Sequence, residues 1–271
     1  MADLKTEKEI EIMRVCGKIL AEVLFKLLEH AKVGVSELEL DQLAEKLILE
    51  KGAEPGFKKV KGYRHTICIS TNDVVVHGIP TDYKLKEGDV VGIDCGVYYK
   101  GFHTDMAETI KVKSQKSKIP TSSRSAGLRG ASKIQKSYEI DKFLQTGERA
   151  MWEGIKAAKL GNKIGDISKS IQDVVEGQGY SVVRSLIGHG VGRELHEDPE
   201  VPGFLDGPIA KTPILQEGMT IAIEVIYNMG KSDVEYLNHD GWTIKSKDGS
   251  LSGLFERTIV ITSSGSFVLT K

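Results

Sequence analysis

The chain has 271 residues, of which 40% are hydrophobic and 28% charged, and its formal net charge is −1. This composition is typical of a globular protein, and the small net charge gives no general attraction to nucleic acid or to a membrane surface. No segment approaches the roughly 20 apolar residues of a membrane span, and the charged N-terminal segment lacks the apolar core of a signal peptide. Three irregularly spaced cysteines do not form a disulfide framework, so we expect a soluble, cytoplasmic protein.

Two helices are predicted at the start of the chain, each after a residue that can cap a helix. Thr6 precedes apolar residues at helical spacing up to Val23, and this pattern stops at residues 32–34. Ser36 precedes a second pattern of the same kind, which ends at Gly52. The beginning of the chain is therefore predicted to be a helical pair.

A segment rich in β-strands follows, and one of its strands ends in an acid. The predicted strands span residues 66–70, 74–76, 90–94 and 105–112. Asp94 directly follows the apolar residues of its strand, and His77 directly follows another strand. Because an ionised carboxylate in apolar surroundings is costly unless a partner compensates it, Asp94 is a candidate functional residue.

Residues 113–137 differ sharply from the rest of the chain. This segment contains seven Lys or Arg, seven Ser and no acidic residue, and it has almost no apolar periodicity. We expect an inserted, mobile basic loop, followed by an amphipathic helix from Tyr138 to Lys159.

Several features of the first half recur in the same order after this loop. Glu217-Gly218 opens an apolar strand that ends at Glu224, as Glu87-Gly88 opens the strand that ends at Asp94. The order helix, helix, strands thus occurs twice, over residues 1–112 and 138–271. We expect two pseudo-symmetric halves that share one sheet within a single domain covering residues 1–271, with a site between the halves.

Five residues are candidate metal ligands: Asp94, Asp105, His189, Glu224 and Glu256. Four carboxylates and one imidazole suit two divalent first-row ions. Each residue also has an ordinary interpretation: Asp94 as a solvated strand end, His189 as a structural histidine between glycines, and Glu256 as the ion-pair partner of Arg257. The repeat favours the metal site, because it places Asp94 and Glu224 at equivalent positions.

Taken together, these motifs resemble the type I methionine aminopeptidases. The resemblance rests on Asp94 and Asp105 eleven residues apart, Gly188-His-Gly-Val-Gly-Arg-Glu-Leu-His196, Glu224 after Glu217-Gly-Met, and Glu256 before Arg-Thr. It covers nearly the whole chain except the basic loop. It implies an α/β (α+β) fold of the pita-bread type, in which helices cover a curved antiparallel sheet. It also implies a dinuclear enzyme that removes the initiator methionine from nascent peptides.

The resemblance implies a role for each matching residue. The five candidate ligands would hold two ions (Mn, Fe, Co or Zn), with Asp105 and Glu256 as bridging ligands. Glu224 would also be the base that activates the attacking water. His77 and His196 would contact the peptide near the scissile bond, although a hydrogen-bonded loop histidine is the ordinary alternative. Tyr63, Cys68, Leu195 and Trp242 would form the methionine pocket, with plain core packing as the alternative.

The chain departs from the family pattern at two places. Relatives usually have a short connection where residues 113–137 lie, and they often have a phenylalanine where this chain has Leu195. The chain begins directly with its first helix, so we expect neither an N-terminal extension nor the extra domain of the related proline-specific peptidases. Such a peptidase, and a catalytically silent binding protein of the same fold, remain the alternative functions.

The expected partners are nascent peptides that begin with Met followed by a small residue. We expect a monomer with no membrane contact. The basic loop 113–137 could contact ribosomal RNA, because clustered Lys and Arg favour phosphate, but a solvated insertion is the simpler interpretation.

Overall fold

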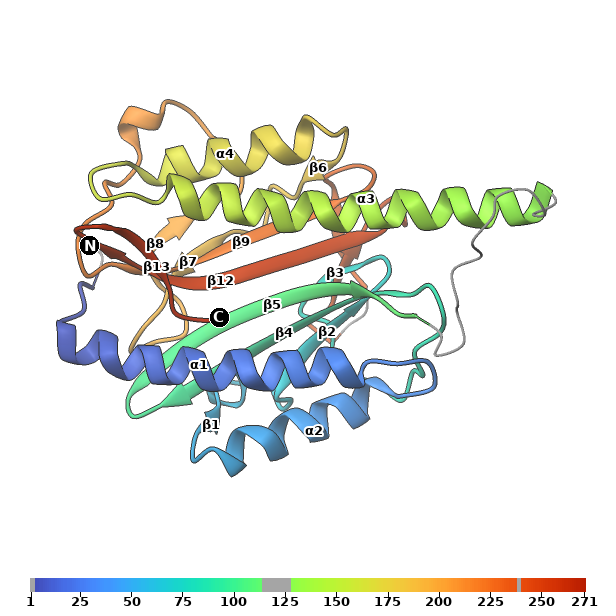
Figure 1. Cartoon of the computed structure of the whole chain (residues 1–271), viewed down its shortest axis with the longest axis horizontal. Helices are drawn as coiled ribbons and strands as arrows, with labels where there is room; N and C mark the ends of the chain where they lie inside the picture. Colours follow the sequence, from blue (N-terminus) through green and yellow to red (C-terminus); the bar gives the residue numbers. More distant parts are fainter. Residues whose placement is uncertain (1–2, 114–127, 238–239) are drawn as a thin grey trace.

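The computed structural model describes residues 3–113, 128–237 and 240–271, and within them the centre of the molecule is a ten-stranded antiparallel sheet (Figure 1). Its strands are β1 (Glu54–Pro55), β2 (Ile67–Thr71), β4 (Val90–Tyr99), β5 (Phe102–Lys111), β6 (Ser181–Val182), β7 (Gly188–Gly190), β8 (Glu197–Val201), β9 (Thr220–Asn228), β12 (Ser252–Thr262) and β13 (Gly265–Val268). The main order is β1-β4-β5-β12-β9-β7-β8, with β2 beside β4, β6 beside β9, and β13 beside β12. Strands from both halves of the chain therefore meet at the β5–β12 pair.

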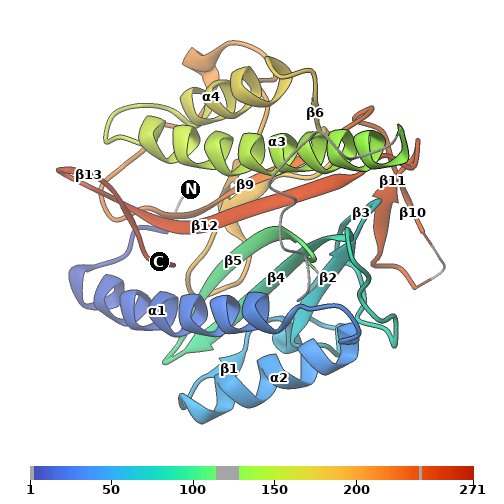
Figure 2. The ribbon, with the colours of Figure 1, turned by 45° about the vertical axis from the view of Figure 1, so that its right-hand side comes forward.

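Four α-helices occur in the described part of the chain: α1 (Glu7–His30), α2 (Glu37–Glu50), α3 (Leu128–Ala157) and α4 (Ile164–Glu176). The first pair covers the half of the sheet that contains β4 and β5, and the second pair covers the half with β9 and β12 (Figures 1 and 2). None of the helices described is long and apolar enough to cross a membrane. Each half has its own apolar core, so helices and sheet form two similar layered units.

Matched hydrogen bonds relate the two halves. Gly34 and Gly161, which follow the first helix of each half, have φ of 92° and 85°. The N–H of Gly34 donates to Leu85 O over 2.8 Å, and that of Gly161 donates to Leu215 O over 3.0 Å. Because few residues other than glycine adopt such φ values readily, the sequence echo reflects a shared turn geometry. The two halves are pseudo-symmetric, as predicted.

The strands that carry two of the predicted acids also begin in the same way. Gly88 and Gly218 have φ of 92° and 83°, and the N–H of each donates over 2.9 Å to a carbonyl at the end of a neighbouring strand: Val112 O just after β5, and Ile261 O near the end of β12. Asp94 and Glu224 each lie six residues beyond the corresponding glycine. They therefore occupy equivalent positions on β4 and β9.

The prediction of a loop through residue 137 is wrong at its C-terminal end. Helix α3 begins at Leu128, ten residues before the predicted start at Tyr138. Residues 135–139 are exposed, so this part of the helix has no buried face that apolar periodicity could reveal. Once the packed part of α3 exists, each added residue gains a backbone hydrogen bond, and Lys and Gln favour this extension. Residues 114–127 of the predicted loop lie outside the described residues.

A second, three-stranded sheet contributes to the site. Its strands are β10 (Val234–Tyr236), β11 (Ile244–Ser246) and β3 (Val74–Val76), in the order β10-β11-β3. His77 follows β3 directly, and Trp242 lies just before β11. The small sheet therefore links these two residues, which are far apart in the sequence.

Candidate active site

Four neighbouring strands carry a row of directly opposed residues. Asp94 on β4 lies opposite Ala107 on β5, and Ala107 lies opposite Glu256 on β12. Glu256 in turn lies opposite Glu224 on β9. Because opposed residues of antiparallel strands project from the same face, the register brings three acids to one side of the sheet. The small side chain of Ala107 separates Asp94 from Glu256.

The other two predicted ligands lie on the same face. Asp105 is two residues from Ala107 on β5, and side chains two residues apart on a strand point the same way. His189 on β7 lies opposite Ala222, which is two residues from Glu224. One ligand atom each from Asp105, His189 and Glu256 lie within 4.8 Å of one another. The fold therefore brings all five predicted ligands together.

Burial strongly perturbs the acids of this cluster. Burial, and secondly repulsion from Asp105, raises the pKa of Asp94, Glu224 and Glu256 well above the ordinary range. Burial also raises the pKa of Asp105 to about 7, against the lowering effect of hydrogen bonds from Asp94 and from the Met106 N–H. The cluster thus holds several carboxylates that repel one another once they are ionised.

Basic side chains do not neutralise this cluster. Arg257 directly follows Glu256, but alternation along β12 turns it to the opposite face. There its guanidinium lies 2.6 Å from Glu108 Oε2 and donates to Ala107 O over 3.1 Å. The described residues that line the cavity over the acids include neither Lys nor Arg. The predicted alternative, a Glu256–Arg257 ion pair, is therefore wrong.

Two carboxylate oxygens show what the cluster lacks. Asp94 Oδ1 and Glu256 Oε1 are buried and have no hydrogen-bond partner among the described residues. Leaving such atoms without a partner costs free energy, and more so when the group is charged. A divalent cation would both pair with these oxygens and relieve the repulsion. The carboxylate-rich donor set, with its one imidazole, suits first-row divalent ions.

The orientation of His189 agrees with this fit. Its Nδ1 is 2.8 Å from Gly190 O, so Nδ1 carries the proton and donates it. Its Nε2, left with a lone pair, is 3.3 Å from Glu224 Oε1. Burial, and then His196, lowers the pKa of His189 to about 4, so the ring is neutral at pH 7. A neutral imidazole with its lone pair facing a carboxylate is the arrangement of a metal ligand with a fixed tautomer.

His77 has an unusual backbone conformation. Its φ is 55°, in the left-handed region that residues other than glycine seldom adopt. The backbone is held there because Gly78 O accepts a 2.9 Å hydrogen bond from the Ile69 N–H. Such strain costs on the order of 1–3 kcal/mol, and it is found mostly at functional sites. Here it brings the His77 side chain into the lining of the cavity.

His196 borders the cavity from the other half of the chain. Its ring contacts that of His189 edge to face, with the centroids 4.4 Å apart. Burial lowers the pKa of His196, and burial followed by the effect of His196 lowers the pKa of His77. Both rings are therefore predominantly neutral at pH 7, and each can donate or accept a hydrogen bond.

The four residues predicted to form the methionine pocket lie in one apolar cluster. Tyr63, Cys68 and Leu195 are buried together with Phe57, and Trp242 packs against them. The Tyr63 hydroxyl donates to Ile67 O over 2.8 Å, so the ring presents its apolar surface. The Tyr63 and Trp242 rings meet edge to face, with centroids 5.1 Å apart.

A cavity of about 500 Å³ joins this apolar cluster to the acids. All eleven predicted site residues line it. Sequence reasoning missed several further lining residues: Phe57, Val60, Val76, Leu186, Ile187, Asp198, Glu200, Ile226 and Leu254. Most are apolar and carry no pattern that separates them from core residues; only their spatial neighbours reveal them.

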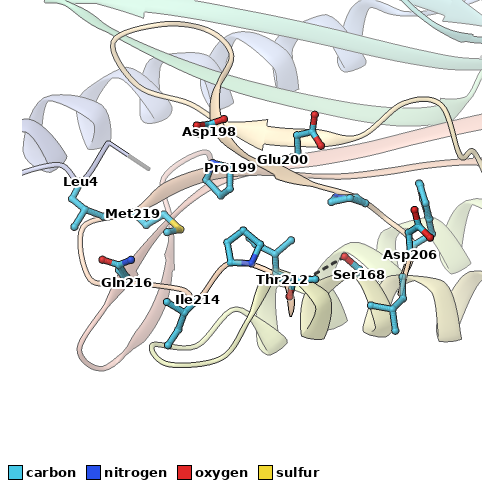
Figure 3. A pocket seen from close by; sticks show the side chains of 15 residues that line it. Leu4, Ser168, Asp198, Pro199, Glu200, Asp206, Thr212, Ile214, Gln216 and Met219 are labelled. Carbon is cyan, nitrogen blue, oxygen red and sulfur yellow. Dashed lines mark hydrogen bonds between the residues drawn. The ribbon is translucent and has the colours of Figure 1, made fainter. Parts of the chain in front are cut away.

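A second cavity, of about 720 Å³, borders β8 (Figure 3). It is lined largely by apolar residues such as Leu4, Ile214 and Met219, and none of the five clustered ligands lies there. In Figure 3 the carboxylates of Asp198 and Glu200 point away from Ile214. Although it is larger, this cavity lacks convergent reactive groups, so the cavity over the acids is the candidate active site.

Comparisons with known proteins agree with this assignment. The model of metallopeptidase family M24 matches residues 11–263. A methionine aminopeptidase of Clostridium perfringens is 43% identical over 270 residues, which is 100% of this chain and 99% of that protein. Methionine aminopeptidase 1 of Bacillus subtilis is 40% identical over 267 residues, with 98% of each chain covered.

Solved structures give the same result. The crystal structure of a methionine aminopeptidase from Thermotoga maritima has a TM-score of 0.87 at 35% identity and covers 100% of both chains. A prolidase from Pyrococcus furiosus has a TM-score of 0.71 at 24% identity; 99% of this chain aligns with 65% of that one, which shows a shared fold.

The fold and the acid-lined cavity thus define a pita-bread metallohydrolase, as predicted. The chain belongs to metallopeptidase family M24.

Proposed function

We propose that this protein is a methionine aminopeptidase that removes the initiator methionine from nascent peptides. The observation that carries the proposal is that one cavity has two different ends. Buried carboxylates and His189 form one end, and the apolar cluster around Tyr63 and Trp242 forms the other. An unbranched, apolar methionine side chain suits the apolar end, and its peptide bond would then lie over the acids. The relatives named above carry the same activity in their names.

We propose that five residues hold two divalent ions: Asp94, Asp105, His189, Glu224 and Glu256. Asp105 and Glu256, on the neighbouring strands β5 and β12, would hold the ions at the centre of this set, which their proximity to each other and to His189 supports. Bound ions would polarise the scissile carbonyl and make water a stronger nucleophile. The donor set accepts Mn, Fe, Co or Zn, so availability in the cell would decide which ion is used.

The chain's own groups would then handle the proton and the substrate. Glu224 accepts a proton from the attacking water, and the proton then passes to the departing amine. The position of Glu224 among the buried acids that line the cavity supports this role. His77 holds the peptide nitrogen, and His196 donates a hydrogen bond to the scissile carbonyl. The position of both rings in the lining of the cavity supports these roles.

The substrate of this proposal is a peptide whose N-terminal Met is followed by a small residue. The cytoplasm supplies such peptides and keeps thiols reduced, and Cys16, Cys68 and Cys95 are free. We further propose that the protein acts as a monomer, since one chain supplies all eleven proposed site residues.

A peptide-cleavage assay tests the activity. Release of the first residue is measured from Met-Ala-Ser, Leu-Ala-Ser and an Xaa-Pro peptide, after chelation and after addition of Mn²⁺ or Co²⁺. We expect metal-restored cleavage of Met-Ala-Ser alone. Cleavage of the Xaa-Pro peptide would instead identify a proline-directed peptidase of the same fold. If none of the peptides is cleaved with any metal, the result would instead support a catalytically silent binding protein of the same fold.

Ribosome contact through the basic segment is a separate proposal. Residues 113–137 carry seven Lys or Arg and no acid, a composition that favours phosphate contact. Changing all seven Lys and Arg of residues 113–137 to Gln removes the positive charge while keeping the length of the connection and residues that favour the start of α3 at Leu128. Co-sedimentation with ribosomes would fall, and its salt dependence would weaken, if the segment binds RNA; unchanged binding would contradict this.

A further inference from the structure

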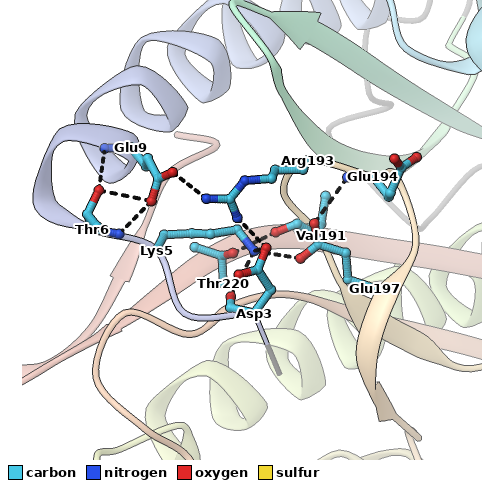
Figure 4. Close-up of polar contacts among 9 residues, drawn as sticks. All are labelled: Asp3, Lys5, Thr6, Glu9, Val191, Arg193, Glu194, Glu197 and Thr220. Atoms are coloured by element: carbon cyan, nitrogen blue, oxygen red, sulfur yellow. Dashed lines mark hydrogen bonds and ion pairs between the residues drawn. The ribbon is translucent and has the colours of Figure 1, made fainter. Parts of the chain in front are cut away.

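The segment before α1 contains a lysine whose side chain is fully buried (Figure 4). Lys5 Nζ lies 2.6 Å from Glu197 Oε2, and the two side chains are 0% and 11% exposed. Nζ also donates to Asp3 O over 2.8 Å. Burying an ammonium group is costly unless it is paired and hydrogen-bonded, so this geometry is tightly defined. Lys5 therefore fixes the position of Glu197.

Glu197 directly follows His196 at the start of β8. Its second oxygen, Oε1, accepts a 3.1 Å hydrogen bond from the Glu194 N–H. One carboxylate thus holds the chain on both sides of Leu195 and His196. These are the residues assigned above to the methionine pocket and to the scissile carbonyl.

Residues 191–196, which connect β7 to β8 and are called the His196 loop below, are also hydrogen-bonded to strands that carry proposed metal ligands. Thr220 Oγ1, on β9, donates to Val191 O over 2.6 Å. The N–H of His103, on β5, donates to Gly192 O over 2.6 Å. The backbone of Lys5 is also bonded next to β9, because its N–H donates to Gly218 O over 2.8 Å. The lysine therefore connects the His196 loop to the turn that opens β9.

Gly192 leaves the space that the lysine occupies. A Cβ at this position would lie 2.2 Å from Lys5 Cε and 2.6 Å from Nζ. Outside this contact, Arg193 forms ion pairs with Asp3 and Glu9, which hold the N-terminal segment against the loop (Figure 4). The segment before α1 thus contacts the loop through two basic residues.

We propose that Lys5 is a positioning residue for catalysis: through Glu197 it holds His196 and Leu195 at the cavity. The role rests on the proposed aminopeptidase function, since it assigns Lys5 an effect on that reaction. Lys5 itself is not among the residues that line the cavity. Its partner Glu197 does line the cavity, so the effect of Lys5 on the reaction must pass through Glu197 and the residues that Glu197 holds.

The test measures kcat and KM for Met-Ala-Ser in Lys5→Met and in Gly192→Ala. The second variant keeps every charged group but displaces the Lys5 side chain and crowds Glu197 Oε1, which would lie 3.0 Å from the new Cβ. Misplacing a contacting group by about 1 Å can cost about 100-fold in rate, so kcat should fall about 10- to 100-fold in both variants, with a smaller change in KM. Lys111→Met is the matched control. Lys111, the last residue of β5, also has a largely buried side chain, and it forms an ion pair with an acid, Asp141 on α3. The Lys111→Met variant should change kcat by less than about 3-fold, against the 10- to 100-fold loss expected for the two test variants.

A double-mutant cycle separates positioning from general stability. In a His196→Ala background, Lys5→Met should lower kcat by less than about 3-fold, because the group it positions is already gone. Equal losses in both backgrounds, or a Lys5→Met variant as active as the unmodified protein, would overturn the proposal. If Lys5→Met does not fold, the same cycle with Gly192→Ala decides.

Hydrogen exchange provides a readout that needs no activity. The amides of residues 194–197 should exchange faster in Lys5→Met than in the unmodified protein, while those of β4 and β12 stay protected. Unchanged exchange at 194–197 would contradict the proposal. If the unmodified protein cleaves no methionyl peptide but exchange changes as expected, the proposed function fails while the link from Lys5 to the loop stands.

Discussion

Glu256 on β12 lies directly opposite Glu224 on β9, so two buried acids face the same cavity from neighbouring strands. Like charges directly opposite each other destabilise a sheet. With Asp94 and Asp105 nearby, this arrangement is stable only if the acids keep protons or share a cation. Metal, pH and stability are therefore linked at this site.

Metal should stabilise the protein more at high pH than at low pH. The pKa of Asp105 is raised in the folded state, from 3.8 to about 7. Its contribution to the stability of the chelated protein is fully present below pH 4 and is lost as the pH rises through about 7. A cation binds the ionised form, so the increase in Tm on adding Mn²⁺ should be larger at pH 8 than at pH 5.5. An increase that does not change with pH would contradict this linkage.

Asp105→Asn should stabilise the chelated protein at pH 8, although it removes a proposed ligand. At a pH above both values, a rise in pKa from 3.8 to about 7 means that the ionised Asp105 destabilises the folded state by roughly 4 kcal/mol. Because the variant also loses hydrogen bonds of Asp105, we expect its free energy of unfolding to increase by on the order of 2 kcal/mol. Urea unfolding in EDTA measures it. The exposed Asp206→Asn serves as the control and should change stability by less than about 0.5 kcal/mol. Destabilisation by Asp105→Asn would contradict the inferred cost of burying the ionised Asp105.

Ala107→Val should weaken metal binding. Ala107 is fully buried between Asp94 and Glu256 in the row, and added methyl groups would crowd both acids. Overpacking costs about 1–3 kcal/mol. If this cost falls on the metal-bound form, Mn²⁺ affinity should decrease by roughly 5- to 150-fold. Isothermal titration calorimetry measures the affinity. Ala150→Val overpacks the core beneath α3 instead and should lower Tm while leaving Mn²⁺ affinity unchanged.

Three of the proposed ligands stand in local patterns that mark them as candidates in the sequence. Asp94 and Glu224 each follow an apolar run that begins with the same Glu-Gly pair, and His189 lies between glycines. The expectation that these two acids end their strands is wrong, because β4 continues to Tyr99 and β9 to Asn228. The capped starts of α1 and α2 could also be predicted from a local pattern: Thr6 and Ser36 each accept a hydrogen bond from a backbone N–H three residues later.

Features that depend on register or on distant contacts could not be predicted. The place of Ala107 beside Glu256 joins residues 149 positions apart, and the buried Lys5–Glu197 pair joins residues 192 apart. Residues 74–76 were recognisable as a strand, but not their pairing with β11, because a short apolar run does not encode its partner. The early start of α3 could not be seen in the apolar pattern, since residues 135–139 are exposed.

The most direct test of the account follows methionine release from Met-Ala-Ser while Mn²⁺ is added to the chelated protein. We expect no release in EDTA, release that rises as the metal binds, and a loss of about 100- to 10,000-fold in kcat for Glu224→Gln, the proposed base. Circular dichroism should show that this variant stays folded. Release that is insensitive to the chelator, or a Glu224→Gln variant with unchanged kcat, would contradict the central claim that these buried acids form a metal-dependent aminopeptidase site.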